Sequence, residues 1–113
     1  MGKDKNKFLA ILKNVFLETL DENEYDLTIF GSWAKGEQRE TSDIDIALIP
    51  KVTKSKKESF DDILKLRQAI HESSFPHLYD VVNPELASEE IKQSIEQEKV
   101  LVDVMLNSNN KDG

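Results

Sequence analysis

Apolar residues in the first part of the chain recur at helical spacing. From residue 8 onward they fall three or four positions apart, whereas Lys13, Asn14 and Glu18 point elsewhere around the helix. Such spacing places a single apolar face against a core. The pattern therefore predicts an amphipathic packing helix, whose inward positions are Phe8, Ile11, Leu12, Val15, Phe16 and Leu20.

Short runs of β-branched and aromatic residues predict three strands. These residue types fit a pleated sheet, and Gly or Pro ends a strand because it breaks the pairing pattern. The polar segment between the first two runs contains Gly36 and suits a turn with a short helix. The first two strands are expected to be neighbours. The runs cover residues 25–30, 44–49 and 78–82, and they end at Gly31, Pro50 and Asn83.

Two more helical patterns follow, and together the elements predict an α/β fold. One helix carries an apolar stripe, and another begins at the N-cap Ser88 with two glutamates in its first turn. Residues 99–106 fit a short strand or a continued helix equally well. We expect a small, twisted mixed sheet with helices packed mainly on one face. The stripes are Phe60, Ile63, Leu64, Leu66, Arg67 and Ile70, then Ile91 and Ile95.

Length and composition narrow the possible classes of protein. A chain of 113 residues fits one domain, which we place at residues 1–106, with a disordered polar tail at 107–113. A net charge of −7 argues against nonspecific nucleic-acid binding. The absence of Cys excludes thiolate metal sites and cysteine nucleophiles. Because no apolar run or signal-peptide core is present, we expect a cytoplasmic protein without membrane contact.

Two aspartates offer the first sign of chemistry. Asp43 and Asp45 flank Ile44 at the start of the second predicted strand, so side-chain alternation places both carboxylates on one face. Adjacent anions repel one another unless a cation joins them, and Mg²⁺ prefers one or two carboxylates together with phosphate oxygens. An isolated Asp-x-Asp pair is also common at solvated strand ends, so this pair alone does not identify a site.

A glycine and a serine upstream of the aspartates strengthen the case for a phosphate site. Gly31 and Ser32 lie where the first strand stops and a short helix begins. Glycine lets backbone approach a phosphate closely, and a serine hydroxyl adds a donor. An ordinary glycine turn is the alternative. The lysine-rich stretch 51–57 is expected to be a solvated loop, with phosphate contact as its alternative.

Taken together, these residues resemble the DNA polymerase beta-like nucleotidyltransferases. Their signature is a hydrophobic residue, Gly, Gly or Ser, a spacer, and then Asp-hydrophobic-Asp-hydrophobic. Phe30-Gly31-Ser32 and Asp43-Ile44-Asp45-Ile46 fill every position. The chain looks most similar to the minimal nucleotidyltransferases, which are commonly encoded beside HEPN-domain proteins. The order of elements agrees from about residue 8 to residue 102.

This resemblance implies a set of site residues and cofactors. Asp80, on the third predicted strand, stands where the family carries a third carboxylate, so Asp43, Asp45 and Asp80 become the expected catalytic and metal-binding triad. The family's scheme implies two Mg²⁺ ions and ATP as the favoured substrate, with Asp80 helping to activate the acceptor hydroxyl. The implied nucleotide-binding residues are Gly31, Ser32, Lys35 and Ser42.

The chain departs from its relatives at two positions. Relatives often carry Arg where this chain has Trp33 and Lys35, and a lysine replaces the charge but not the bidentate fork. The indole of Trp33 is expected to pack over the short helix, with stacking on a base or acceptor as the alternative. His71 and His77 are isolated, and neither is assigned a catalytic role.

The resemblance also implies a partner and leaves rival functions open. An antitoxin-type member would bind a HEPN-type toxin in a hetero-oligomer and adenylylate one of its hydroxyls. A noncatalytic module that neutralises its partner by contact is one alternative. Nucleotide transfer to RNA or to a small molecule is another, which the acidic charge and the absence of accessory domains make less favourable.

Overall fold

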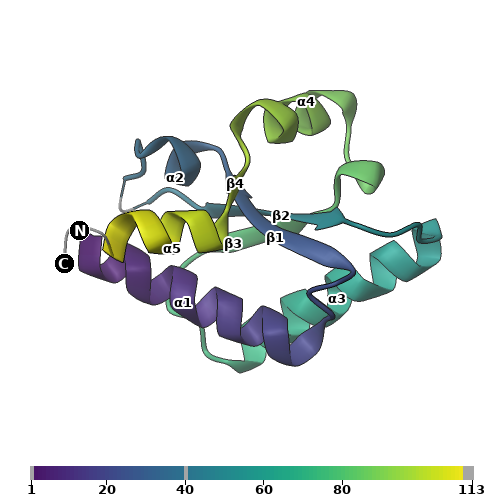
Figure 1. Ribbon diagram of the computed structural model, residues 1–113, viewed down its shortest axis with the longest axis horizontal. Helices are drawn as coiled ribbons and strands as arrows, with labels where there is room; N and C mark the ends of the chain where they lie inside the picture. Colours follow the sequence, from purple (N-terminus) through teal and green to yellow (C-terminus); the bar gives the residue numbers. More distant parts are fainter. Residues whose placement is uncertain (1, 40, 111–113) are drawn as a thin grey trace.

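A four-stranded mixed sheet forms the centre of the fold (Figure 1). The computed structural model describes residues 2–39 and 41–110. The strand order is β3-β2-β1-β4; β1 pairs antiparallel with both β2 and β4, whereas β2 and β3 are parallel. The two predicted neighbours therefore do pair. The strands are β1 (Tyr25–Phe30), β2 (Ile44–Pro50), β3 (Tyr79–Val82) and β4 (Val100–Leu101).

Three helices cover one face of this sheet, and a fourth lies over the other (Figure 1). The first group is α1 (Gly2–Thr19), α3 (Lys56–Glu72) and α5 (Val102–Asn110). The opposite face carries α4 (Glu89–Glu98) and the 3₁₀ turn η1 (Pro84–Leu86), and the one-turn helix α2 (Ser32–Lys35) follows β1. The predicted fold class, a mixed sheet with helices mainly on one face, is confirmed.

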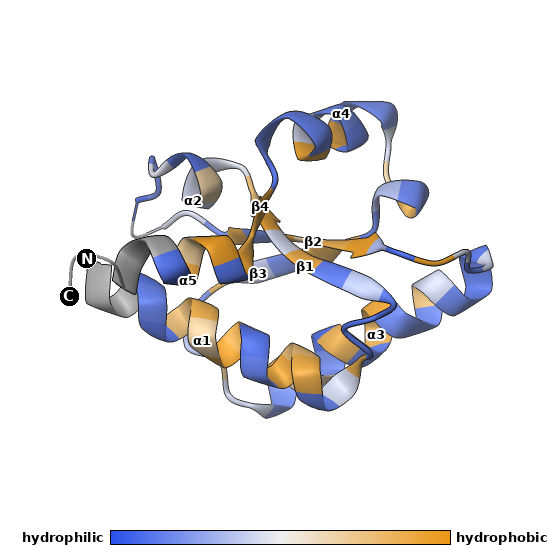
Figure 2. Cartoon of the chain, viewed as in Figure 1, coloured by the Kyte–Doolittle hydropathy of each residue, from blue (hydrophilic) through white to orange (hydrophobic). Residues whose placement is uncertain are grey.

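Side-chain alternation explains why the two faces differ (Figure 2). Inward residues of β1 and β2, such as Ile29 and Ile46, are fully buried on the face that α1, α3 and α5 cover. The opposite face holds only a small apolar cluster of Phe30, Ala47 and Ile95. The α4 face of the sheet therefore carries a smaller apolar core than the opposite face, and polar side chains of β2 and β3 lie on it.

Two predicted apolar stripes are less buried than expected. Phe60 and Leu64 of α3 are 54% and 46% exposed, and Ile91 of α4 is 40% exposed. The buried α3 residues include Ser59 and Ile63, each one position earlier than the exposed pair. One position turns a helix by about 100°, so Phe60 and Leu64 lie on the neighbouring, solvent-facing stripe.

The open prediction for residues 99–106 resolves into both alternatives. Val100 and Leu101 pair with Ile29 and Thr28 as β4, and α5 begins at the next residue. This helix runs to Asn110, four residues into the segment predicted as a polar tail, and residues 111–113 lie outside the described part. None of the helices within residues 2–39 and 41–110 has the length and apolar character that crossing a bilayer requires.

The lysine-rich segment is partly a structural element. Lys54 is largely buried, with its Nζ 2.7 Å from Glu24 and 3.2 Å from Asp62. The hydroxyl of Tyr25 donates to the same Asp62 carboxylate at 2.6 Å. These contacts join the start of β1 to α3. Because the Lys54 ammonium is already paired with two carboxylates, it is not free to contact a phosphate in this arrangement.

Removing the Tyr25 hydroxyl should destabilise the fold. Tyr25 is 1% exposed, and Tyr25→Phe removes a buried donor to a charged acceptor, which should lower the free energy of unfolding by about 1–2 kcal/mol. Urea unfolding measures the effect. Tyr79→Phe is the matched control, because its hydroxyl donates to the Arg67 carbonyl at an exposed position and its loss should cost less. Equal losses in both variants would contradict a structural role for the Tyr25–Asp62 contact.

Candidate active site at the aspartate end of the sheet

Strand pairing brings the predicted aspartates to one end of the sheet. Asp45 of β2 stands in register with Asp80 of β3 on one side and with Phe30 of β1 on the other. Residues in register share a sheet face, and here that is the α4 face. Asp43 lies two residues before Asp45, just ahead of β2, and is exposed. The structure therefore brings all three predicted carboxylates to the same region.

Negative charge accumulates around Asp45. Partial burial raises the pKa of this carboxyl above its ordinary value, and the neighbouring charges of Asp43, Asp80 and Glu98 raise it further. Asp43 and Asp80 remain exposed. The arrangement thus concentrates four acidic groups, the partly buried Asp45 among them, and a bound cation would relieve their mutual repulsion.

Asp80 is turned toward its own strand edge. Its Oδ1 accepts the Val81 N–H at 3.0 Å and lies 3.8 Å from the Arg67 guanidinium on α3. Throughout the described residues, no three Asp, Glu or His side chains are close enough to form a ready metal cage. The oxygen donors nevertheless suit Mg²⁺, because Asp43 and Asp45 share one strand end and Asp80 stands in register with Asp45 on the neighbouring strand.

Gly31 is fitted directly against the central carboxylate. Its φ of +75° is one that residues with a side chain rarely adopt, and a Cβ at this position would lie 2.4 Å from Asp45 Oδ2. The close approach that the sequence predicted for a phosphate is thus made to the aspartate itself. Glycine at this position lets the backbone between β1 and α2 pass beside the acidic cluster.

Glu98 also belongs to this site, although no sequence pattern singles it out. Its Oε1 accepts the Gly31 N–H at 3.2 Å, and its Oε2 lies 3.3 Å from Lys35 Nζ. Lys35 is also 3.8 Å from Glu37. Glu98 ends α4, and the pairing of β4 with β1 carries that helix end to residue 31. Only this long-range pairing could have identified it.

Trp33 packs as expected, and the two remaining predicted nucleotide-binding residues, Ser42 and Ser32, differ in role. Trp33 is 4% exposed, and its Nε1 donates to the Ser42 carbonyl at 3.2 Å. The indole meets the ring of His77 edge-on at 5.2 Å, so the packing interpretation is confirmed. The Ser42 hydroxyl accepts the Arg39 N–H at 2.9 Å and shapes the loop before Asp43. Within the described residues the Ser32 hydroxyl has no protein partner, which leaves it available to a ligand.

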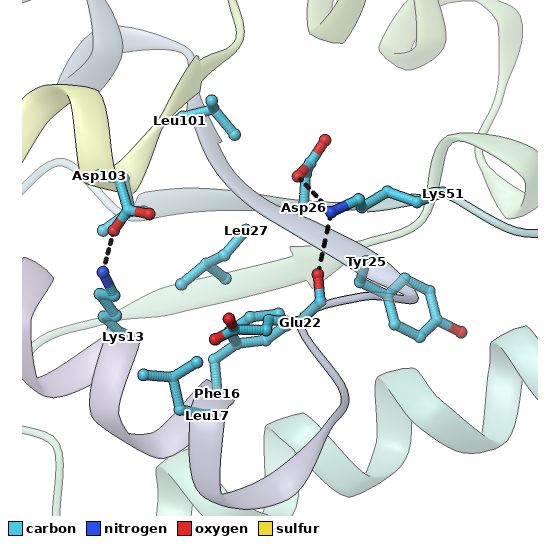
Figure 3. A pocket seen from close by; sticks show the side chains of 11 residues that line it. Lys13, Phe16, Leu17, Glu22, Tyr25, Asp26, Leu27, Lys51, Leu101 and Asp103 are labelled. Atoms are coloured by element: carbon cyan, nitrogen blue, oxygen red, sulfur yellow. Dashed lines mark hydrogen bonds and ion pairs between the residues drawn. The ribbon is translucent and has the colours of Figure 1, made fainter.

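A cavity of about 270 Å³ lies away from these residues (Figure 3). It opens between α1, β1 and the β4–α5 junction, and ion pairs from Lys13 to Asp103 and from Lys51 to Asp26 lie at its sides. None of the predicted site residues lines it. The cavity is therefore separate from the acidic end of the sheet and is not the candidate active site.

Comparisons with solved structures identify the fold. A protein from Sulfolobus solfataricus assigned as a nucleotidyltransferase is 26% identical, with a TM-score of 0.57 over 88% of this chain and 84% of that one. A toxin–antitoxin structure with AMP-PNP is 18% identical, with a TM-score of 0.55 over 91% and 84%. A variant of the MntA–HpeT toxin–antitoxin complex is 16% identical, with the same TM-score and coverage.

A search of curated proteins finds no match to the sequence, whereas a family model does match it. The model described as polymerase beta, nucleotidyltransferase matches residues 17–105, a range that includes Gly31, all three aspartates and Glu98. On this match, and with the fold and the strand-end aspartates in agreement, the chain belongs to the polymerase beta nucleotidyltransferase family.

Proposed function

We propose that this chain is a Mg²⁺-dependent nucleotidyltransferase that moves a nucleoside monophosphate, AMP from ATP, onto a hydroxyl of a partner protein. The observation that carries the proposal is the acidic cluster: Asp45 is in register with Asp80, repelled by Asp43, and backed by a glycine whose position leaves no room for a Cβ. Family membership supports nucleotidyl transfer in general. The metal, the nucleotide and the acceptor are the proposed parts.

The acidic residues divide the work at this site. Asp43 and Asp45 would hold the metal that accompanies the triphosphate, and Asp80, whose Oδ1 now accepts the Val81 N–H, would help to hold the second. When bound, the two ions neutralise charge on the phosphates and on the attacking oxygen. Ser32 and the Gly31 N–H contribute donors for phosphate oxygens, and Lys35 contributes a positive charge.

The proposed reaction is an in-line displacement at the α-phosphorus. The acceptor hydroxyl oxygen forms a new bond to that phosphorus, the bond from the α-phosphorus to the bridging oxygen of the β-phosphate breaks, and pyrophosphate leaves. The hydroxyl proton passes to the carboxylate of Asp80, which is exposed on the open face of the sheet. The protein contributes mainly positioning and charge stabilisation.

A HEPN-type toxin is the proposed acceptor. Two of the similar structures are toxin–antitoxin complexes, and one of them holds AMP-PNP. We extend this pairing to the present chain and propose that it silences its toxin by adenylylating a hydroxyl within a hetero-oligomer. Contact-only neutralisation is the competing function, favoured by one observation: Glu98 already occupies the Gly31 N–H and contacts Lys35.

A transfer assay separates these functions. The protein is incubated with Mg²⁺, the product of its neighbouring gene and each of the four α-labelled nucleoside triphosphates, and the label is followed by gel and intact mass. We expect label on the partner from ATP, none in EDTA, and none with Asp43→Asn/Asp45→Asn. Asp61→Asn, which makes the same Asp-to-Asn change once at an exposed position on α3, is the control and should transfer normally.

Neutralisation of the toxin without transfer of labelled nucleotide would contradict the proposed transferase function. If the complex forms and the toxin is neutralised equally by the wild type and by the double variant, contact alone is the function. If label appears on RNA or on a small molecule instead of the protein, transfer stands and the proposed acceptor is wrong.

A further inference from the structure

The Glu98 carboxylate contacts two groups that the proposed function assigns to the triphosphate. One oxygen accepts the Gly31 N–H at 3.2 Å, and the other is 3.3 Å from Lys35 Nζ. Both groups attract anions: a backbone N–H at a strand end and an ammonium. The Glu98 side chain is 25% exposed and that of Lys35 is 46% exposed, so the carboxylate is partly shielded from water and the ammonium lies at the rim of the site.

A phosphate oxygen and the Glu98 carboxylate cannot occupy these positions together. The Gly31 N–H has one hydrogen to donate, and two anions in the same place repel each other strongly. Glu98 also adds to the negative charge around Asp45. A bound triphosphate would therefore meet both an occupied donor and an additional like charge as long as Glu98 stays where it is.

We infer that Glu98 is an internal competitor of the nucleotide, which takes the place of a phosphate group on Gly31 and Lys35 and must swing out before a triphosphate can bind. The inference rests on the proposed function, since it assumes that a nucleoside triphosphate is the ligand of this site. It adds a control step to that function: the affinity for nucleotide is set by how readily this carboxylate leaves.

The surrounding backbone permits such a movement without unfolding. Glu98 is the last residue of α4, and Lys99 is already extended, with φ −62° and ψ 139°. The next residue, Val100, pairs with Ile29 and fixes the chain beyond it. A side-chain rotation at Glu98 can thus release Lys35 and the Gly31 N–H toward a phosphate while the backbone pairing of β4 with β1 is kept.

Nucleotide binding to a neutral variant tests this competition. Glu98→Gln keeps an oxygen that can accept the Gly31 N–H but removes the charge that holds Lys35. We expect Mg²⁺-bound α,β-methylene ATP, which resists cleavage at the reacting bond, to bind about tenfold more tightly by calorimetry, equivalent to one charged contact that no longer has to be broken. Glu96→Gln, an exposed change of the same charge on α4, should alter affinity less than about twofold.

A second readout reports on the contact itself. The Gly31 amide resonance of ¹⁵N-labelled protein should shift when the nucleotide replaces the carboxylate in the wild type, and Glu98→Gln should reach the same bound-state position at lower nucleotide concentration. Thermal unfolding verifies that both variants are folded. A variant that merely lost stability would not bind the nucleotide more tightly.

Two different results would overturn the competition alone or the competition together with the proposed function. If the wild type binds nucleotide and Glu98→Gln binds it no more tightly, the competition is wrong and nucleotide transfer still stands. Weaker binding by the variant would mean that Glu98 supports the ligand or its metal. If neither protein binds any of the four nucleotides at millimolar concentration with Mg²⁺, the proposed function and the competition are both overturned.

Discussion

Gly31→Ala is expected to destabilise the protein by about 2–3 kcal/mol and to reduce nucleotidyl transfer at least about a hundredfold. Gly31 has φ +75°, and the added Cβ would lie 2.4 Å from Asp45 Oδ2, so either the backbone or the central carboxylate must move. Because a displaced carboxylate misplaces the reacting groups, transfer should fall further than the loss of stability explains. Urea unfolding and transfer of α-labelled nucleotide measure the two effects.

Gly36 provides a partial control for this substitution. It has nearly the same φ, +74°, but its ψ of 21° lies in the left-handed region, whereas Gly31 has ψ −153°, and a Cβ added at Gly36 would meet no atom within 4 Å. Gly36→Ala therefore gives a lower bound on the cost of the backbone conformation alone, at about 1 kcal/mol. If the two alanine variants lose equal stability and activity, the close approach of Gly31 to Asp45 is not what matters. Partial recovery of stability on adding Asp45→Ala to Gly31→Ala would identify the clash directly.

Asp43→Asn/Asp45→Asn is expected to abolish transfer, by at least about a thousandfold, while making the metal-free fold slightly more stable. Burial and the charges of Asp43, Asp80 and Glu98 raise the pKa of Asp45, so ionising this carboxyl at neutral pH costs folding free energy. Removing both charges should raise the free energy of unfolding by at most about 1 kcal/mol, since water screens half-buried groups.

The higher free energy of unfolding expected for Asp43→Asn/Asp45→Asn should depend on pH in one direction. A carboxyl whose folded pKa lies above its unfolded value favours the fold when protonated and loses that contribution as the pH rises through the folded pKa. The stability advantage of the double variant in EDTA should therefore be present near pH 7 and should shrink as the pH falls toward about 4. Asp61→Asn should show no such trend. An advantage that grows on acidification would contradict the repulsion described around Asp45.

The effect of Mg²⁺ on the melting temperature should also distinguish Asp43→Asn/Asp45→Asn from the wild type. Added with nucleotide, it should raise the melting temperature of the wild type because a ligand that binds only the native state stabilises it. The double variant should show no metal-dependent increase. An equal increase in both proteins would place the metal elsewhere.

The sequence could identify Asp43 and Asp45 because alternation along one strand is a local property. Asp80 is 35 residues further along the chain than Asp45, and α3 crosses between their strands. The register that places them side by side follows from the parallel pairing of β2 with β3. Only the resemblance to a family pointed to Asp80 in advance.

Other features depended on contacts that no local pattern records. Glu98 reaches the site because the two-residue strand β4 pairs with β1, and a strand of that length has no periodic signal. Phe60 fits the predicted apolar stripe because it is apolar, but the side of α3 that buries Ser59 and Ile63 leaves Phe60 exposed. The amphipathic character of the Trp33 indole predicts packing, and its hydrogen bond to the Ser42 carbonyl agrees with that prediction.

A paramagnetic metal ion can show whether the acidic end of the sheet holds a metal–nucleotide complex. ¹⁵N-labelled protein carrying Mg²⁺ and α,β-methylene ATP would be titrated with Mn²⁺, which broadens the amide resonances nearest to it. We predict early broadening at residues 30–32, 43–46 and 79–81. Broadening centred instead on the cavity near Leu17, Leu27 and Leu101, or none at all with the nucleotide bound, would contradict the assignment of this site.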